Sequence, residues 1–455
     1  MENSNRKKTG NQPAGPGITT SPRFKAALAF AATAAFCWLI YGVARRIMGH
    51  GGEVDMNRRY RDFLEFYSGA KAMLTGGNIY KAGYLGYIYP PLLAFLMAPL
   101  AMLPISEAAW IWLAIKTLLL AACGWFGAIE VQRRLNRPSD WPAVMLTFVA
   151  GMLLDFDKIR TEMNMQQTNL LVLLCFVLAL RWLDKRPLLS GAAIGLGANI
   201  KYVTLIAIPY LLLRRRFRAA AASAGWTVIW ALVPAASVGW SENIRLLKGA
   251  LGGLANLKTA NSAAGGAARI QGPAFGQSLS SFAVRYFGSG RQDLESLAVL
   301  AALALIFFMV NWFVYRRAGV PFFAGRGGER EKQGIMRGVT ALEWAGLVVV
   351  VLAFGPQTNS PHLSMLLLIC MTAVAVLMAP SRSVPGKPLI IGLVLMVGAL
   401  VLPPGGIGLN RAVDFWRNCF GIVWCVLAMY VTLLWVGLRR LKEYAGPPEQ
   451  PGGNE

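Results

Sequence analysis

Apolar segments of roughly bilayer-spanning length recur along the chain, and short polar or basic segments separate them. The first apolar segment is residues 24–41 and the last is residues 413–438. A helix needs about 20 apolar residues to cross the hydrocarbon core of a membrane. These segments do not alternate with the period of two that a transmembrane barrel strand requires. The pattern therefore predicts an all-α, polytopic membrane protein of about twelve transmembrane helices.

Two stretches depart from simple one-way crossings. Residues 88–104 and 106–130 are both apolar, yet the basic segments around them allow one net crossing. We therefore expect 106–130 to span and 88–104 to be re-entrant or shallow. Residues 188–213 begin and end beside basic segments, which predicts a pair of short helices that turn near residues 199–201.

The charge distribution sets the orientation. Only 15% of the residues are charged, the mean hydropathy is +0.47, and the net charge is +23. Nucleic acid is not an expected partner, because Lys and Arg gather in short segments between the apolar runs. This is the distribution that marks cytoplasmic loops. The basic segments are residues 133–137, 181–186, 214–218, 316–337, 382–387 and 439–442.

The rule that basic segments lie in the cytoplasm also predicts the topology of the rest of the chain. We expect disordered cytoplasmic tails at residues 1–22 and 443–455, with one transmembrane domain, residues 23–442, between them. Outer loops are expected at residues 45–87, which contain an amphipathic segment, and at residues 240–293. Residues 155–168 are expected to form a shorter outer loop.

Metal and nucleotide chemistry find little support in the sequence. The six cysteines lie in or beside apolar runs without a C-x-x-C pair, as buried small hydrophobes do. Two histidines, His50 and His362, are too few for a metal cluster. A Gly-rich phosphate loop before a basic residue is also missing. We therefore expect neither a metal nor a cofactor.

The segment from Tyr60 to Pro104 carries the first candidate site. Asp62 and Glu65 are three residues apart, which places both on one face of a helix. Aromatic residues follow them, and a carboxylate beside apolar surface can act as a general base. The alternative is a solvated face of a surface helix. The later Tyr89-Pro90-Pro91 sequence is interpreted as shaping the backbone.

Later polar residues have two interpretations each. Lys201 is either a point charge for a phosphate or a side chain that reaches a lipid headgroup. His362 either contacts a phosphate or makes a local hydrogen bond at a helix entry. Gln167 and Asn169 either bind sugar hydroxyls or cap the next helix.

These residues together resemble a known family. The order Asp62, Tyr67, Gly76-Gly77, Tyr89-Pro90-Pro91 and Leu103-Pro104 is similar to the first-loop signature of the polyprenol-phosphate-mannose-dependent α-mannosyltransferases. These are membrane glycosyltransferases of the GT-C class. Further matches are Gln167-x-Asn169, Lys201 before the basic run 214–218, and Ser360-Pro361-His362. Gln166 departs from the pattern, because the family commonly has Gly there.

The resemblance implies an inverting transfer from a polyprenyl-phosphate sugar to a lipid or glycan acceptor at the outer face of a bacterial plasma membrane. Asp62 would be the catalytic base, and Lys201 and His362 would hold the donor phosphate. Glu65, Tyr67, Gln167 and Asn169 would bind the acceptor or sugar. An outer arginine would assist; the candidates are Arg269, Arg285 and Arg291.

Two other functions are compatible with the sequence. A transporter or flippase for a lipid-linked or amphipathic solute would use a similar polar cavity, but its polar groups would extend through the midplane to both faces. A non-catalytic assembly factor is the other alternative. Polar groups that gather toward one face favour the transferase.

Overall fold

The computed structural model describes residues 21–48, 61–83, 86–137, 139–256, 276–287, 293–322, 330–356, 358–379, 381, 383–401, 415–416 and 420–445. Over these residues all regular structure is helical, which confirms the all-α class. The helices are α1 (Pro22–Met48), α3 (Arg61–Leu74), η2 (Ile79–Lys81), α4 (Pro91–Ala101), α5 (Ile105–Arg134), α6 (Trp141–Leu154), α7 (Phe156–Met165), α8 (Asn169–Trp182), α9 (Pro187–Ala198), η3 (Tyr202–Ile206), α10 (Ala207–Leu213), α11 (Phe217–Leu232), α12 (Ala235–Val238), α13 (Trp240–Asn256), α14 (Leu279–Phe287), α15 (Asp293–Ala318), α16 (Arg330–Phe354), η5 (Ser360–Leu366), α17 (Leu367–Leu377), α18 (Lys387–Val401) and α20 (Gly421–Ala445).

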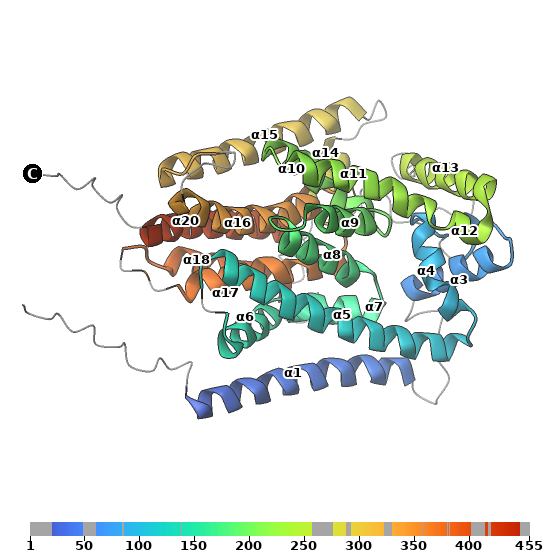
Figure 1. Cartoon of the computed structure of the whole chain (residues 1–455), viewed down its shortest axis with the longest axis horizontal. Coiled ribbons are helices and arrows are strands. Elements are labelled where there is room, and N and C mark those ends of the chain that lie inside the picture. The colour runs from blue at the N-terminus through green and yellow to red at the C-terminus, as the bar shows by residue number, and fades with distance from the viewer. Residues whose placement is uncertain are drawn as a thin grey trace, which may run out of the picture.

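Most long helices lie along one axis of the molecule (Figure 1). The start of α1 and the end of α20 lie at one end of this axis, and α3, α4 and α13 lie at the other. Seven of the described helices are long and apolar enough to cross a membrane, and six more are apolar but shorter. The protein is therefore a multi-pass helical membrane protein. The number of about twelve crossings stays a prediction.

The first apolar pair follows the predicted pattern. Helix α4 has 11 residues, which at about 1.5 Å per residue is too short to cross a bilayer. Pro90 and Pro91 stand at its start, where a missing backbone N–H costs little. Pro104 then caps α5, which has 30 residues. The segment 88–104 therefore contains a short helix before a long spanning one.

Three of the expected outer loops contain helices, and the one in residues 45–87 was predicted from the spacing of Asp62 and Glu65. Residues 155–168 were expected to be an outer loop, but most of them form α7. The long loop 240–293 contains α13 and α14, and the loop 45–87 contains α3. These helices mix charged and apolar positions, so they lack the continuous apolar run that marks a membrane span. The predicted tails lie almost entirely outside the described residues.

Helix α9 is held against α11 by closely approaching backbones. A Cβ at Gly191 would lie 2.6 Å from the backbone of Ala222, and a Cβ at Gly195 would lie 2.6 Å from the backbone of Thr227. Small residues four apart allow helices in a membrane to pack this closely. Because α9 leads to residues 199–201, this contact fixes the expected turn between α9 and η3.

A buried charge cluster joins α10, α15 and α16. Glu343 accepts hydrogen bonds from the Tyr210 hydroxyl (2.8 Å), Arg214 Nε (2.8 Å) and the Tyr315 hydroxyl (2.5 Å). Each buried polar group thus has a partner, as burial in a low-dielectric interior requires. The cluster ties the basic segment 214–218 to the helix bundle.

We predict that Gly191→Ala destabilises the protein, because the added methyl group meets the backbone of α11. Overpacking of this kind costs about 1–3 kcal/mol. Gly225→Ala is the matched control, since a Cβ at Gly225 in α11 meets open space. Thermal unfolding in detergent should show a lower midpoint for the first variant and an unchanged or higher one for the second. Equal midpoints would contradict the proposed helix contact.

Candidate active site

Five polar residues from separate elements meet at one end of the bundle. Lys201, between α9 and η3, donates from Nζ to Gln167 Oε1 (2.9 Å) and to Asn169 Oδ1 (2.6 Å). His362 Nε2, from η5, lies 3.4 Å from the same Nζ. Asp62, from α3, shares a side-chain hydrogen bond with Gln167. The fold thus brings together residues that are up to 300 positions apart in the chain.

The Gln167 amide connects the acid and the cation. Its oxygen accepts from Lys201, so its NH₂ group is the donor toward Asp62. Burial raises the pKa of the Asp62 carboxyl above its usual value, while this hydrogen bond and the charge of Lys201 oppose the rise. Asp62 is only partly buried. It can therefore exchange a proton with a group that approaches it.

The Lys201 ammonium is buried and held by fixed acceptors. Burial lowers the pKa of Lys201 to about 8, and the negative charges of Glu162 and Asp62 oppose this effect. Its Nζ also lies 5.6 Å from the centre of the Tyr89 ring. Below about pH 8 the side chain is therefore a cation with two of its three hydrogens bonded to amides.

The tautomer of His362 follows from its backbone contact. The backbone N–H of Asn359 donates to Nδ1 of His362 (3.1 Å). Because Nδ1 accepts, the hydrogen of the ring lies on Nε2, which faces Lys201 Nζ. Two hydrogen-bond donors therefore stand 3.4 Å apart, and an anionic oxygen near both would satisfy both.

A buried ion pair lies behind Asn169. Glu162, near the end of α7, accepts from Lys116 Nζ (3.0 Å), from the backbone N–H of Asn169 (3.1 Å) and from Asn169 Nδ2 (2.8 Å). Lys116 also donates to the Glu162 carbonyl (2.8 Å). The carboxylate thus caps the N-terminus of α8, where negative charge is favourable.

A comparison with known protein families identifies the family of this chain. Residues 87–325, more than half of the chain, match glycosyltransferase family 87. The chain belongs to glycosyltransferase family 87. This range includes Gln167, Asn169 and Lys201, whereas Asp62 and His362 lie outside it.

Similar curated proteins are mycobacterial. This family 87 chain is 31% identical over 183 residues to a polyprenol-phosphate-mannose-dependent alpha-(1-2)-phosphatidylinositol pentamannoside mannosyltransferase of Mycolicibacterium smegmatis, which covers 38% of this chain and 42% of the relative. It is 29% identical over 208 residues to a polyprenol-phosphate-mannose-dependent alpha-(1-2)-phosphatidylinositol mannoside mannosyltransferase of Mycobacterium tuberculosis, which covers 40% and 46%. The matches thus span less than half of each relative.

A solved structure is similar over most of the chain. The crystal structure of ArnT from Cupriavidus metallidurans in the apo state covers 92% of this family 87 chain and 77% of its own, with a TM-score of 0.39 and 11% identity. At this level the likeness supports no inference about function.

Two predicted site residues of this family 87 protein point elsewhere. The Tyr67 hydroxyl donates to the Leu103 carbonyl (2.8 Å), which ties α3 to the start of α5. A Cβ at Gly83 would lie 1.9 Å from Glu65 Oε2, so this carboxylate reaches the backbone after η2. Neither residue has a described contact with Lys201. Their predicted roles in acceptor or sugar binding stay predictions.

Sequence reasoning missed three residues of the cluster. Tyr89 was interpreted as a shaping residue, but it packs edge-on against Phe66 (ring centres 5.0 Å apart) and lies over Lys201. Burial raises the pKa of its hydroxyl. Lys116 and Glu162 were given no catalytic or binding role. A lysine inside the apolar run 106–130 was the available signal, since such a charge needs a partner.

The predicted outer arginines are only partly described. Arg285, in α14, is exposed and lies over the ring of Phe420 (4.8 Å). Arg269, Arg291 and His50 lie outside the described residues.

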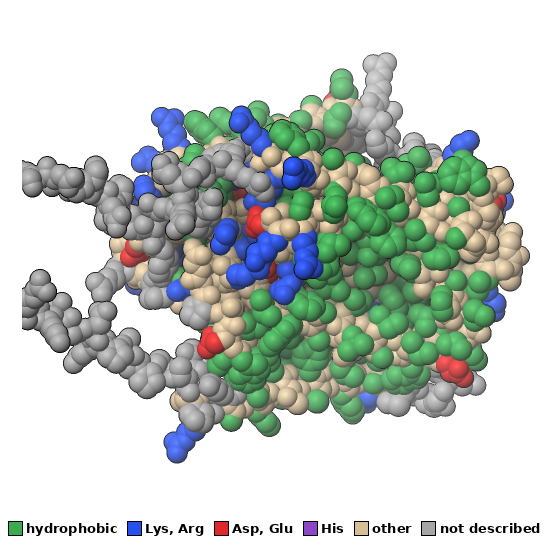
Figure 2. Space-filling model, viewed as in Figure 1, with side chains coloured by type: hydrophobic (Ala, Val, Ile, Leu, Met, Phe, Trp, Pro, Cys, Tyr) green, Lys and Arg blue, Asp and Glu red, His purple; other side chains and the backbone are tan. Residues whose placement is uncertain are grey.

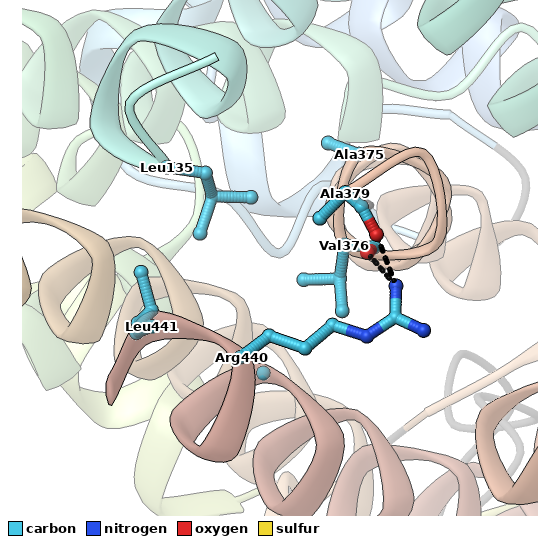
Figure 3. Close-up of a pocket in the computed structure, with 7 residues that line it drawn as sticks. Leu135, Ala375, Val376, Ala379, Arg440 and Leu441 are labelled. Carbon is cyan, nitrogen blue, oxygen red and sulfur yellow. Dashed lines mark hydrogen bonds between the residues drawn. The ribbon is translucent and has the colours of Figure 1, made fainter. Parts of the chain in front are cut away.

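The small hollow in Figure 3 is not part of this site. It lies at the far end of α17 from His362, and apolar side chains such as Leu135 and Leu441 line most of it. Arg440 donates there to the carbonyls of Val376 (2.6 Å) and Ala379 (2.9 Å). The arginine thus satisfies carbonyls at the end of a helix, which is a structural role.

We predict that Lys116→Met destabilises this family 87 protein strongly. The change leaves the Glu162 carboxylate buried without its cation, at a cost of about 3–5 kcal/mol. The double variant Lys116→Met/Glu162→Gln should lose less stability, because burying an amide costs less free energy than burying an unpaired charge. Thermal unfolding of both variants in detergent provides the measurement. Equal falls in the unfolding midpoint would show that the unpaired Glu162 carboxylate is not the cause of the destabilisation.

Proposed function

We propose that this protein is an inverting mannosyltransferase. It moves mannose from a polyprenyl-phosphate donor to a phosphatidylinositol mannoside-type glycolipid at the outer face of a bacterial plasma membrane. The observation that carries the proposal is the Gln167 amide, which places a carboxylate and a buried ammonium on either side of one side chain. A base and a cation at this spacing suit displacement of a phosphate leaving group.

The proposed reaction uses the described groups directly. Asp62 takes the proton of an acceptor hydroxyl as its oxygen attacks C1 of the sugar. The bond from C1 to the phosphate oxygen breaks, and the electron pair leaves with the lipid phosphate. Lys201 Nζ and His362 Nε2 each donate a hydrogen bond to that oxygen. Their position as two adjacent donors supports this assignment.

Charge supports an outward-facing site. The helices α5, α8 and α20 each end at a basic segment, and α9 begins just after one. Asn169 and Lys201 stand at the opposite ends of α8 and α9 from those segments. Figure 2 shows the same bias, because most Lys and Arg side chains on this face lie in the half that holds the start of α1 and the end of α20. Basic segments favour the cytoplasm, which leaves the site outside.

The relatives support the substrate classes. The mycobacterial proteins are named for a polyprenol-phosphate-mannose donor and for phosphatidylinositol mannoside acceptors. Membership of a glycosyltransferase family also favours transfer over the transporter or flippase alternative. The donor is a substrate, and the proposed reaction uses no cofactor.

We predict that Asp62→Asn lowers turnover by roughly 10²- to 10⁴-fold, the usual contribution of a general base. Purified protein is incubated with polyprenyl-phosphate mannose and phosphatidylinositol mannosides, and the product is measured by mass spectrometry. Asp157→Asn is the matched control, because this α7 carboxylate pairs with Lys158 and Arg160. Wild-type turnover in Asp62→Asn would remove the proposed base.

We predict that donor binding weakens as the pH rises through about 8. Lys201 binds phosphate only when protonated, and its pKa is about 8, so the cation is present below this pH and lost above it. The KM for the donor is measured from pH 6 to 9.5. Asp62 acts in the opposite direction, since activity should fall as the pH drops through its raised pKa. A donor KM that stays constant across the range would contradict the role of Lys201.

A further inference from the structure

Glu162 uses both of its oxygens without reaching the site surface. The side chain is fully buried, and so is Lys116, its ion-pair partner. Oε1 receives Lys116 Nζ and the backbone N–H of Asn169, while Oε2 receives Asn169 Nδ2. A buried carboxylate is costly, and well-packed apolar residues of similar volume often stabilise a protein as well as a buried ion pair does. A pair that persists in such a place needs a reason beyond stability.

The carboxylate decides which way the Asn169 amide faces. The two ends of this amide have nearly the same shape, so packing alone does not distinguish them. Glu162 accepts hydrogen bonds and donates none when ionised, so the NH₂ end of Asn169 must face it. The oxygen end then faces Lys201 Nζ at 2.6 Å. With the opposite orientation, two donors would meet at Lys201.

Lys201 is surrounded by groups from six elements. Two amide oxygens accept from its Nζ, and the remaining hydrogen is available for an anionic ligand beside His362 Nε2. The titratable, charged and aromatic groups that face Lys201 are Asp62 from α3, Tyr89 before α4, Lys116 from α5, Glu162 from α7 and His362 from η5. Asp62 and Glu162 are the two carboxylates among them.

Charge gives Glu162 a second effect. Burial disfavours the ammonium form of Lys201, and Glu162 is the largest opposing influence on the pKa of this lysine. Without the carboxylate, Lys201 would lose its proton at a lower pH. The same residue thus holds the amide that orients Lys201 and helps keep Lys201 charged.

We propose that Glu162, held by Lys116, is a positioning residue that acts through Asn169 to orient and charge Lys201 for the phosphate of the lipid donor. This inference rests on the proposed function of Lys201. Glu162 itself does not touch the substrate.

The test is Glu162→Gln, assayed with polyprenyl-phosphate mannose from pH 6 to 9.5. At pH 7.5 we expect the KM for the donor to rise at least about three-fold, because a fall of about one unit in the pKa of Lys201 would lower its protonated fraction by that factor. The alkaline limb of the pH profile should move to lower pH. The acid limb, which reports Asp62, should also move to lower pH, because the charge of Glu162 helps to raise the pKa of Asp62. Asp157→Asn, also in α7, is the control and should keep the wild-type profile.

Glu162→Asp is the second variant, and it carries the test if Glu162→Gln does not fold. It retains the charge but withdraws the carboxylate by one carbon. We expect its alkaline limb to stay near the wild-type position while its donor KM rises. A folded Glu162→Gln protein with the wild-type limb and donor KM would overturn the proposal. So would a loss of kcat that is the same at every pH.

Lys201→Met separates this inference from the proposed function. If Lys201→Met raises the donor KM and Glu162→Gln does not, only the role of Glu162 is wrong. If Lys201→Met keeps the wild-type donor KM, the phosphate-binding role of Lys201 is wrong, and the role of Glu162 falls with it.

Discussion

The structure depends on how a lysine ammonium is held where little water reaches it. A buried cation is unfavourable unless its hydrogens are bonded and its charge is balanced. Lys201 meets both conditions through the oxygens of Gln167 and Asn169 and through nearby carboxylates. Gln167 and Asn169 lie where α7 meets α8, and Lys201 lies between α9 and η3, so the condition is met only when these helices are correctly packed. The proposed site therefore forms only together with the packed helix bundle.

Close helix packing places the groups around Lys201. Glycines at positions 191 and 195 let α9 approach the backbone of α11, so the turn that carries Lys201 is placed against a long helix. Prolines stand at the starts of α4 and α5, and the Tyr67 hydroxyl donates to the carbonyl of Leu103 between these helices. The helix with Asp62 is thus attached to the bundle by the Tyr67 hydroxyl. Rigid placement of this kind is what electrostatic catalysis requires.

The site could be predicted from the sequence in part. Lys201, Gln167 and Asn169 were recognisable because polar groups beside apolar runs need partners, and the structure brings them within hydrogen-bonding distance. Glu65 and Tyr67 lie on the same helix as Asp62, and the contacts described for them are with Gly83 and Leu103, while their predicted binding roles stay predictions. Neighbours on a helix face share a direction, yet the partner that each side chain meets belongs to another element.

The sequence by itself determined the all-helical membrane class, the short segment 88–104 and the turn at 199–201, because hydropathy and the placement of Lys and Arg reflect the bilayer directly. Only the tertiary structure revealed that Lys116 pairs with Glu162 and that Tyr89 lies over Lys201. Contacts between distant segments depend on the relative rotation and depth of helices, which a one-dimensional pattern does not contain.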